Sequence, residues 1–323
     1  SSVTGVQTCA LPIFGAGAFG VALAVALARD GREVRLWGRD VSGLAATRRT
    51  ARLAGVDLPE NVTITAEIDD LRGAEAVLLA LPMQALAGFL RGLDLQTKAL
   101  VACCKGIDLT ALTGPAAVIS AVRPEATVAL LTGPSFAADI ARGLPTALTL
   151  ACADEVSGER LQRLLSTPVL RLYRTTDVAG AELGGALKNV IAIAAGVVIG
   201  AGLGDSARAA LMTRGYAEMV RLALALGARA ETLAGLSGFG DLVLTCGSEQ
   251  SRNFRFGTAL GARGAFDPTV TVEGVATARA VARLAAERGL DLPVTTMVAA
   301  LVDGGIDLSD AIQSLLTRPL KAE

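Results

Sequence analysis

The sequence contains Phe14-Gly15-Ala16-Gly17-Ala18-Phe19-Gly20, which leads directly into the apolar run Val21 to Ala28. This is the pattern G-x-G-x-x-G at the start of a helix, which is typical of dinucleotide-binding domains. The first glycine allows a tight turn, the second lets the backbone approach a pyrophosphate, and the third allows close packing of helix on strand. The helix N-terminus offers free N–H groups and a positive dipole end to the phosphates. We therefore expect Gly15, Gly17 and Gly20 to bind a dinucleotide.

A short strand is expected next, at Glu33 to Trp37, and Gly38-Arg39-Asp40 follows it directly. At this position an acidic residue binds the ribose hydroxyls of NAD, whereas an arginine suits the 2′-phosphate of NADP. Both residue types are present, so the pattern leaves both cofactors open. Arg39 favours NADP.

Further apolar runs alternate with helical patterns, as expected for strands that are buried on both faces. The expected strands are 76–81, 99–104, 128–131, 146–152 and 169–173. This alternation predicts an α/β domain with a Rossmann-like, doubly wound parallel sheet. Ligands bind such sheets beyond the carboxyl ends of the strands, where Lys105 and the segment Gly133 to Ser135 are expected. A surface lysine and a helix-capping serine are the alternatives for Lys105 and Ser135.

The sequence pattern changes after Thr176, where long helical patterns replace the apolar runs expected to form strands. We expect helices over 178–199, 206–226 and 277–288. The predicted domains are therefore a dinucleotide-binding domain over residues 1–176 and an all-α substrate and catalytic domain over residues 177–323. Lys188 lies in the first of these helices, among Ala, Val, Ile and Gly. A cation in a buried helix is paired, has a chemical role, or reaches the surface from the helix end.

Composition excludes several classes of function. The net charge is −1 and aromatic residues are 3% of the chain, which argues against nucleic-acid binding. There is no histidine, and the five cysteines lack a CxxC spacing. We therefore expect no metal site and a reduced, cytoplasmic protein. The longest apolar runs, Val21 to Ala28 and Val190 to Ala201, are shorter than the roughly 20 residues of a membrane-spanning helix, so no integral membrane segment is expected.

Residues 1–13 do not read as the natural start of this fold. They lack the basic and apolar regions of a signal peptide. The stretch Val3 to Ile13 resembles the translation of a sequencing-library adapter, and Pro12 stands where a central strand should run. We expect residues 1–13 to be non-native, and any first strand to be built from about Ala10 to Phe14.

A polar loop between the later helices suits a phosphate. It contains Gly240-Asp241 and Ser251-Arg252-Asn253. An arginine beside amide and hydroxyl donors is typical of phosphate binding, although a solvated loop and a helix cap at Asp241 are the plainer alternatives. Together with a dinucleotide domain, this loop favours hydride transfer to a small phosphorylated substrate. Without histidine, Lys188 is the best candidate for the proton partner, because burial lowers the pKa of a lysine.

The ordered set of motifs resembles the bacterial NAD(P)-dependent glycerol-3-phosphate dehydrogenase family from about Phe14 to near Leu316. The motifs are Gly15–Gly20, Lys105-Gly-Ile, Gly133-Pro-Ser-Phe-Ala137, Glu182-Leu-Gly-Gly-Ala-Leu-Lys-Asn189, Gly202-Leu-Gly-Asp205, Gly240-Asp-Leu-Val-Leu-Thr-Cys246, Ser251-Arg-Asn253 and Val272-Glu-Gly274. The resemblance implies reversible reduction of dihydroxyacetone phosphate to sn-glycerol 3-phosphate with NAD(P)H, which supplies glycerophospholipid synthesis. It also implies a homodimer.

The resemblance assigns roles residue by residue. It makes Lys188, Lys105 and Asp241 catalytic, with Lys188 as general acid and base. The residues implied to hold the substrate are Lys105, Gly133, Ser135, Lys188, Asp241, Ser251, Arg252 and Asn253. Besides the three loop glycines, the residues implied to line the cofactor are Ala18, Phe19, Arg39, Lys105, Ala137, Arg252, Thr271 and Glu273.

Two other functions are compatible with parts of the sequence. A two-domain β-hydroxyacid or 6-phosphogluconate type of dehydrogenase would also have a lysine at the position of Lys188, but it does not predict Gly240-Asp241 together with Ser251-Arg252-Asn253. A catalytically impaired dinucleotide-binding protein would follow if the altered N-terminus weakened cofactor binding.

Overall fold

The computed structural model describes residues 10–68, 74–93 and 97–316. Its packing divides the chain into two compact units. The sheet unit comprises Ser1–Cys104 and Ala116–Val178, and the helical unit comprises Lys105–Pro115 and Ala179–Glu323. The segment Lys105–Pro115 thus packs with the helices, although it follows a strand in sequence. The functional boundary expected between residues 176 and 177 stays a prediction, and most of the stretch expected to be non-native, residues 1–9, lies outside the described residues.

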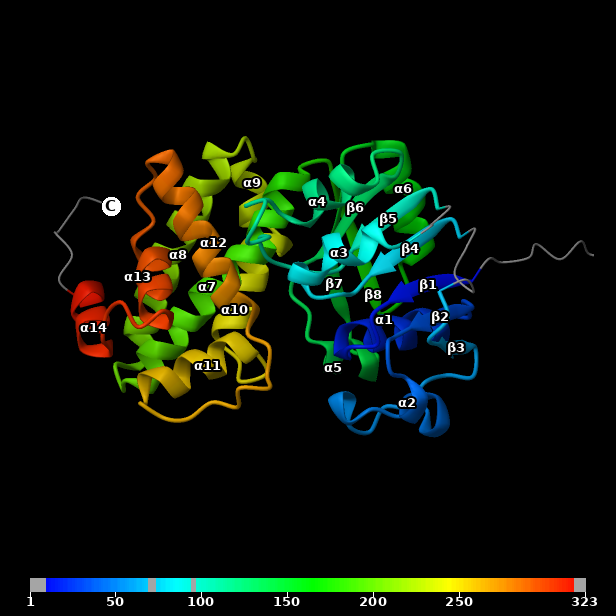
Figure 1. Cartoon of the computed structure of the whole chain (residues 1–323), viewed down its shortest axis with the longest axis horizontal. Helices are drawn as coiled ribbons and strands as arrows, with labels where there is room; N and C mark the ends of the chain where they lie inside the picture. The colour runs from blue at the N-terminus through cyan, green and yellow to red at the C-terminus, as the bar shows by residue number, and fades with distance from the viewer. Residues whose placement is uncertain (1–9, 69–73, 94–96, 317–323) are drawn as a thin grey trace, which may run out of the picture. The chain divides into compact units, whose positions relative to one another are not determined.

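The sheet unit contains an eight-stranded sheet with the order β3-β2-β1-β4-β5-β6-β7-β8 (Figure 1). The strands are β1 (Leu11–Phe14), β2 (Val34–Trp37), β3 (Val62–Thr65), β4 (Ala76–Leu79), β5 (Ala99–Ala102), β6 (Thr127–Thr132), β7 (Thr146–Cys152) and β8 (Leu170–Thr175). All neighbours are parallel except β6 and β7. The predicted Rossmann-like fold is confirmed. The edge strand β3 was not predicted.

The antiparallel pairing of β6 and β7 corrects the expectation of a wholly parallel sheet. The only helix between these strands is α5 (Ala137–Arg142), with six residues. Such a helix is about 9 Å long, whereas a strand of six residues spans about 20 Å. The connection is too short to return the chain to the end of the sheet where β6 begins, so β7 runs back along β6.

The first strand forms despite Pro12. The N–H groups of Leu11 and Gly15 donate to the carbonyls of Glu33 and Trp37, so this side of β1 pairs with β2. Pro12 faces the other neighbour, β4, where the pairing covers only Ile13 and Phe14. Pro12 therefore precedes the residues of β1 that pair with β4, and no backbone hydrogen bond to β4 is lost there. This explains why a proline is tolerated in this central strand.

Alternate residues of the strands fill two layers of core. Ile13 packs in the apolar cluster that the sheet forms with α1 (Ala18–Arg29), α5 and α6 (Glu155–Leu165). Phe14 faces the opposite way and makes edge contacts with Trp37 and Phe89, at 5.6 and 5.1 Å between ring centroids. The remaining helices of the sheet unit are α2 (Ser42–Thr47), η1 (Ala51–Leu53), η3 (Met83–Ala85), α3 (Leu86–Arg91) and α4 (Pro115–Val122). Both faces of the sheet are thus covered, as the apolar strands predicted.

The helical unit is built around α7 (Val178–Gly200). The other helices are α8 (Gly204–Ala225), α9 (Ala230–Ala234), η4 (Leu236–Gly240), α10 (Asp241–Cys246), α11 (Arg252–Gly261), α12 (Glu273–Arg288), α13 (Pro293–Val302) and α14 (Leu308–Leu316). The three helices predicted from sequence correspond to α7, α8 and α12, and all three are confirmed with shifted ends.

Glycines let α7 and α11 touch backbone to backbone. A Cβ at Gly196 would lie 2.1 Å from the carbonyl oxygen of Phe254, and a Cβ at Gly257 would lie 2.0 Å from that of Ile193. Real Cβ atoms do not approach an oxygen so closely, so both positions require glycine. This crossing fixes α11, and with it the residues at the start of α11, against α7.

By length and composition, α7 could cross a membrane, because the helix extends well beyond the apolar run Val190 to Ala201 that the sequence marked. It has 23 residues, and 89% of its most apolar window is buried inside the fold. The central helix of a soluble protein has the same properties, so this single helix is weak evidence for a membrane span.

Candidate active site

The glycine-rich loop of the sheet unit has the geometry that dinucleotide binding requires. Gly15 has φ +114°, and a Cβ there would lie 2.3 Å from the carbonyl oxygen of Ala80. A Cβ at Gly20 would lie 1.9 Å from the carbonyl oxygen of Gly15, so the loop closes tightly on the helix. Gly17 is the N-cap residue of α1, and no side chain at this position caps the N–H groups of the first helical turn. The loop can therefore hold a pyrophosphate.

One cation approaches this loop that the sequence did not single out. The nearest atom to a Cβ built on Gly17 is Nη1 of Arg52, at 3.7 Å. Arg52 lies in η1, where the hydroxyl of Thr50 accepts a hydrogen bond from its N–H. No local pattern marks this arginine, because its nearness to Gly17 depends on the fold of the segment after β2.

The other cofactor residues expected in the sheet unit lie at the ends of elements. Arg39 is exposed just after β2, and the neighbouring Asp40 accepts a 3.0 Å hydrogen bond from the hydroxyl of Ser42. Ala18 and Phe19 are in the first turn of α1, and Ala137 is the first residue of α5. Their contacts with a cofactor stay predictions.

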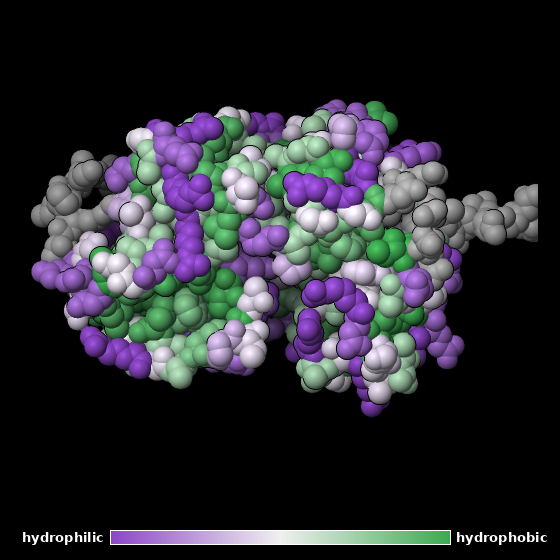
Figure 2. Space-filling model, viewed as in Figure 1, coloured by the Kyte–Doolittle hydropathy of each residue, from purple (hydrophilic) through white to green (hydrophobic). Residues whose placement is uncertain are grey.

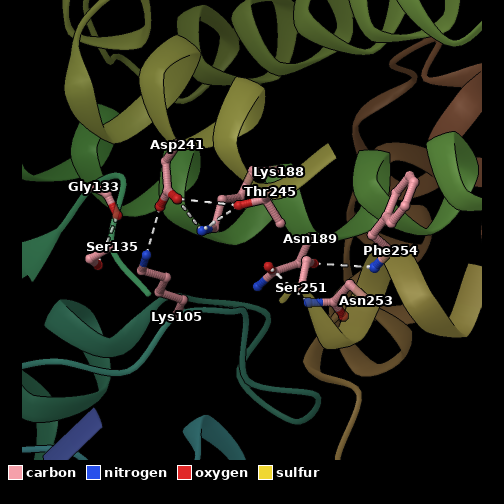
Figure 3. Close-up of polar contacts among 10 residues, drawn as sticks. All are labelled: Lys105, Gly133, Ser135, Lys188, Asn189, Asp241, Thr245, Ser251, Asn253 and Phe254. Carbon is pink, nitrogen blue, oxygen red and sulfur yellow. Dashed lines mark hydrogen bonds and ion pairs between the residues drawn. The ribbon is translucent and has the colours of Figure 1, made fainter. Parts of the chain in front are cut away.

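Gly133 and Ser135 follow β6 at its carboxyl end. Gly133 has φ +134°, and the hydroxyl of Ser135 donates to the Gly133 carbonyl at 3.2 Å (Figure 3). The helix-cap alternative for Ser135 is wrong, because α5 begins only at Ala137 and its N-cap is Phe136. The substrate-binding role of this turn stays a prediction.

In the helical unit, the three residues expected to be catalytic lie together (Figure 3). Lys188 of α7 is 6% exposed, and Asp241 at the start of α10 is fully buried. The ammonium of Lys188 donates to Oδ1 of Asp241, and the ammonium of Lys105 donates to Oδ2 at 2.6 Å. One carboxylate therefore holds two lysines. The alternatives of a surface lysine for Lys188 and a helix cap for Asp241 are wrong.

Thr245 completes this cluster, and the sequence did not assign it a role. Its hydroxyl accepts a 2.9 Å hydrogen bond from Lys188 and lies 3.3 Å from Oδ1 of Asp241. Asp241 and Thr245 are four residues apart on α10, so they face the same side of the helix. That spacing is the signal that could have found Thr245.

A glycine in α7 brings α10 to Lys188. A Cβ at Gly184 would lie 2.5 Å from the carbonyl oxygen of Ser237, which belongs to the π-helical turn η4 directly before α10. Only glycine allows this approach, and the turn delivers Asp241 to the helix face that carries Lys188. The motif Glu182 to Asn189 thus includes both the lysine and the space for its partner.

The environment of Lys188 lowers its pKa from 10.5 to about 7. The largest cause is burial, which disfavours the charged ammonium. The carboxylate of Asp241 opposes this effect, and the nearby positive charge of Lys105 adds to it. A lysine with this pKa can donate and accept a proton near neutral pH.

A second polar cluster links α7, α11 and α12. The side-chain amide of Asn253 donates to Oδ1 of Asn189 at 3.0 Å and accepts from the N–H of Gly274 at 2.9 Å. The hydroxyl of Ser251 accepts from the N–H of Phe254 and so caps α11. Ser251 and Asn253 thus have structural partners, and their substrate contacts stay predictions. Asn189 was not singled out from sequence.

The remaining predicted residues of the helical unit lie at helix starts. Arg252 is the first residue of α11 and is exposed, and Glu273 is the first residue of α12 and is half-buried. Thr271 is exposed just before α12. Their cofactor contacts stay predictions. Over residues 10–68, 74–93 and 97–316, no three acidic or cysteine side chains gather as a metal site would require.

Two family models cover most of the chain. The model described as NAD-dependent glycerol-3-phosphate dehydrogenase N-terminus matches residues 10–157, and the model of the corresponding C-terminus matches residues 177–313.

The chain belongs to the NAD-dependent glycerol-3-phosphate dehydrogenase family.

Curated relatives agree with this membership. The glycerol-3-phosphate dehydrogenase [NAD(P)+] of Cereibacter sphaeroides is 67% identical over 96% of this chain and 99% of its own length. The protein of the same name from Paracoccus denitrificans is 63% identical, with the same coverage. The crystal structure of glycerol-3-phosphate dehydrogenase from Coxiella burnetii superposes with a TM-score of 0.91 at 34% identity, over 96% of this chain and 99% of that one. The resemblance drawn from the motifs is confirmed.

More distant dehydrogenases share only the fold with this member of the glycerol-3-phosphate dehydrogenase family. D-mandelate dehydrogenase superposes with a TM-score of 0.64 at 12% identity. Such similarity shows a common architecture of sheet and helices, and it carries no argument about the substrate.

Proposed function

We propose that this chain catalyses the reversible reduction of dihydroxyacetone phosphate to sn-glycerol 3-phosphate with NADH or NADPH. The observation that supports this most directly is the buried carboxylate of Asp241 between Lys188 and Lys105. The reaction needs a proton donor and a positive charge at one carbonyl oxygen, and these two lysines can supply both. Membership of the dehydrogenase family supports the same chemistry.

The protein's part in the reaction is the transfer of a proton and the stabilisation of charge. The nicotinamide, when bound, supplies the hydride that reaches the carbonyl carbon. The Lys188 ammonium gives its proton to the carbonyl oxygen and becomes a neutral amine. In the reverse direction the amine accepts the hydroxyl proton. The ammonium of Lys105 stabilises the negative charge that develops on the oxygen.

Asp241 makes this arrangement possible because it compensates two cations in a buried site. Without it, Lys188 would be neutral at pH 7 and unable to donate a proton. Thr245 contributes a further acceptor that favours the charged form of Lys188.

We place the substrate phosphate at the start of α11. Arg252 offers a guanidinium there, and the N-terminus of this ten-residue helix offers a positive dipole end. Ser251 and Asn253 order this turn through their bonds to Phe254 and Gly274. Gly133 and Ser135 are assigned to the same substrate.

The residues 1–176 are assigned to cofactor binding and residues 177–323 to substrate binding and catalysis. Ala18, Phe19, Ala137, Thr271 and Glu273 would line the cofactor. Both NAD and NADP fit the loop of Gly15, Gly17 and Gly20, and Arg39 favours NADP because its guanidinium can bind a 2′-phosphate.

The assembly and cellular role follow from the family resemblance. We propose a homodimer in the cytoplasm that supplies glycerophospholipid synthesis. The helical unit has apolar surface that a dimer could bury: Leu224, Phe239 and Val243 are exposed, and Figure 2 shows a further apolar area where Figure 1 places α11 and α13. Sedimentation of the protein at several concentrations tests this, and a concentration-independent monomer would contradict it.

The activity is tested by following NADH and NADPH oxidation with dihydroxyacetone phosphate. We expect turnover with the wild type and a loss of about a hundredfold or more in kcat with Lys188→Ala. A panel of hydroxycarboxylates, including 6-phosphogluconate, is the matched control. Activity on one of these without activity on dihydroxyacetone phosphate would contradict the proposal, and so would equal rates for wild type and Lys188→Ala.

A further inference from the structure

The segment Lys105–Pro115 holds its own shape. The N–H of Asp108 donates to the carbonyl of Thr113 at 2.9 Å, and the N–H of Leu112 donates to the carbonyl of Asp108 at 3.0 Å. The Asp108 carboxylate accepts from two N–H groups that follow it in the chain. The segment is therefore a closed loop, and Lys105 is carried at its first position.

Two contacts fix this loop to the core of the helical unit. The side chain of Ile107 is 2% exposed and packs in the apolar cluster of that unit. The guanidinium of Arg283, on α12, donates to the carbonyl of Leu109 at 3.0 Å. The ammonium of Lys105, two residues before Ile107, reaches Asp241 from this fixed point.

A third contact comes from α7 itself. Gly114 is buried, and a Cβ there would lie 2.0 Å from the carboxyl carbon of Glu182 and 2.3 Å from its Oε2. The carboxyl group of Glu182 thus lies against the loop backbone, in the space that a side chain at Gly114 would fill. Glu182 opens the motif that contains Lys188, six residues later, and the proposed chemistry gives it no role.

We propose that Glu182 and Arg283 are positioning residues that hold the loop Lys105–Pro115 on α7 and α12 and thereby keep the Lys105 ammonium on Asp241. The inference rests on the proposed function for its effect on turnover. Its structural part, the placement of Lys105, can be measured without substrate.

Displacement of Lys105 would change the electrostatic environment of Lys188 and therefore its pKa. The groups that face Lys188 are Asp241, Thr245 and Cys246 of α10, and Lys105 of the loop. Burial raises the pKa of the Cys246 thiol to about 12, so it is neutral near pH 7. If Lys105 leaves, Lys188 loses a repelling charge and has the carboxylate of Asp241 to itself. Both changes favour the ammonium, so the pKa of Lys188 rises.

The test variants are Gly114→Ala, which pushes the carboxyl group of Glu182 away from the loop, and Arg283→Ala. The matched controls are Gly88→Ala, at an exposed helical glycine with no atom within 4 Å of its Cβ, and Arg288→Ala, at an exposed position on α12. The titration of Lys188 is followed in the free protein by the nitrogen chemical shift of 15N-labelled lysine, assigned with Lys188→Met.

We expect the titration midpoint of Lys188 to rise by about one pH unit in Gly114→Ala and less in Arg283→Ala, with no change in the controls. We expect kcat to fall about tenfold in Gly114→Ala, with a smaller change in KM. Glu182→Asp, which shortens the side chain by one methylene, should restore both values in the Gly114→Ala background.

A double-mutant cycle with Lys105→Ala decides whether the effect runs through Lys105. In the Lys105→Ala background, Gly114→Ala and Arg283→Ala should change neither the midpoint nor kcat further. Additive losses, or an unchanged Lys188 midpoint in the single variants, would overturn the proposal. If no protein turns over dihydroxyacetone phosphate, the proposed function fails, while the midpoints still decide the positioning role.

Discussion

Asp241 and Thr245 stand one turn apart on α10, and both accept a hydrogen bond from the ammonium of Lys188. The two acceptors have different charge. The carboxylate compensates the cation, whereas the hydroxyl only solvates it. Their removal therefore has different consequences.

Replacement of Thr245 by valine keeps the shape of the side chain and removes the acceptor. We expect the pKa of Lys188 to fall below about 7, because the charged form loses a hydrogen bond, and kcat at pH 7 to fall about tenfold. The measurement is the pH profile of kcat. Thr245→Ser should retain the wild-type profile. A Thr245→Val profile that superposes on the wild type would show that the hydroxyl does not act on Lys188.

Replacement of Asp241 by asparagine leaves Lys188 buried beside a neutral amide. We expect the amine to be the main form at pH 7, and kcat to fall by about a hundredfold or more. Rapid-mixing kinetics with saturating substrate measures this loss. Asp303→Asn is the control, because that carboxylate forms an exposed ion pair with Arg279. A kcat within threefold of the wild type would contradict the role of Asp241.

Lys188 should make the stability of the protein depend on pH. Its pKa is about 7 in the folded protein and about 10.4 in an unfolded chain. Between these values the unfolded chain binds more protons, so stability rises with pH, by at most about 1.4 kcal/mol per pH unit. The destabilisation is complete below pH 7 and disappears above about pH 10.4.

Urea unfolding of wild type and Lys188→Met from pH 6 to pH 10 isolates this contribution. The unfolding free energy of the wild type, measured relative to that of Lys188→Met, should increase as the pH rises over this range. A difference that stays constant over this range would mean that Lys188 keeps an ordinary pKa in the fold.

Gly196→Ala tests the contact between α7 and α11. The added methyl group would meet the carbonyl oxygen of Phe254, which is backbone and cannot rotate away. We expect a loss of about 1–3 kcal/mol in the free energy of unfolding, as for other overpacked cores. Gly88→Ala, in open space on α3, should be neutral or slightly stabilising. Equal stability of the two variants would contradict the close crossing.

Arg39→Ala tests the choice of cofactor. We expect KM for NADPH to rise about tenfold or more and KM for NADH to change little, because only NADPH has the 2′-phosphate. Steady-state kinetics with both cofactors measures this, with Arg91→Ala on α3 as the control. Equal weakening of the two cofactors would rule out a contact with the 2′-phosphate.

The sequence predicted the sheet, the helical unit and the buried position of Lys188 because each has a local pattern. The apolar runs predicted the strands, and the cation in an apolar helix indicated Lys188. The direction of β7 was wrong, because it depends on the length of α5 rather than on the composition of the strand. The edge strand β3 was missed, because Val62–Thr65 is short and only half apolar.

The parts of the site that sequence reasoning missed depend on contacts between distant segments. Asn189 follows Lys188 directly and Thr245 lies one turn after Asp241, but Asn189 bonds to Asn253 of α11 and Thr245 to Lys188 of α7. Arg52 approaches Gly17 only because the chain after β2 folds back to the loop. Ser251 and Asn253 were predicted as substrate ligands from residue type, and their bonds to Phe254 and Gly274 became visible only in the fold.

The grouping of Lys105–Pro115 with the helices has a consequence for chimeric enzymes. A recombinant that joins halves of two relatives at a single crossover near residue 178 would pair the loop of one parent with the α7 and α12 of the other. Such a recombinant keeps Lys105 and Lys188 together on Asp241 only if both parents have compatible residues at Gly114, Glu182 and Arg283. Exchange of residues 105–115 together with the C-terminal half keeps these partners in register, so three crossover points define the natural modules of this chain.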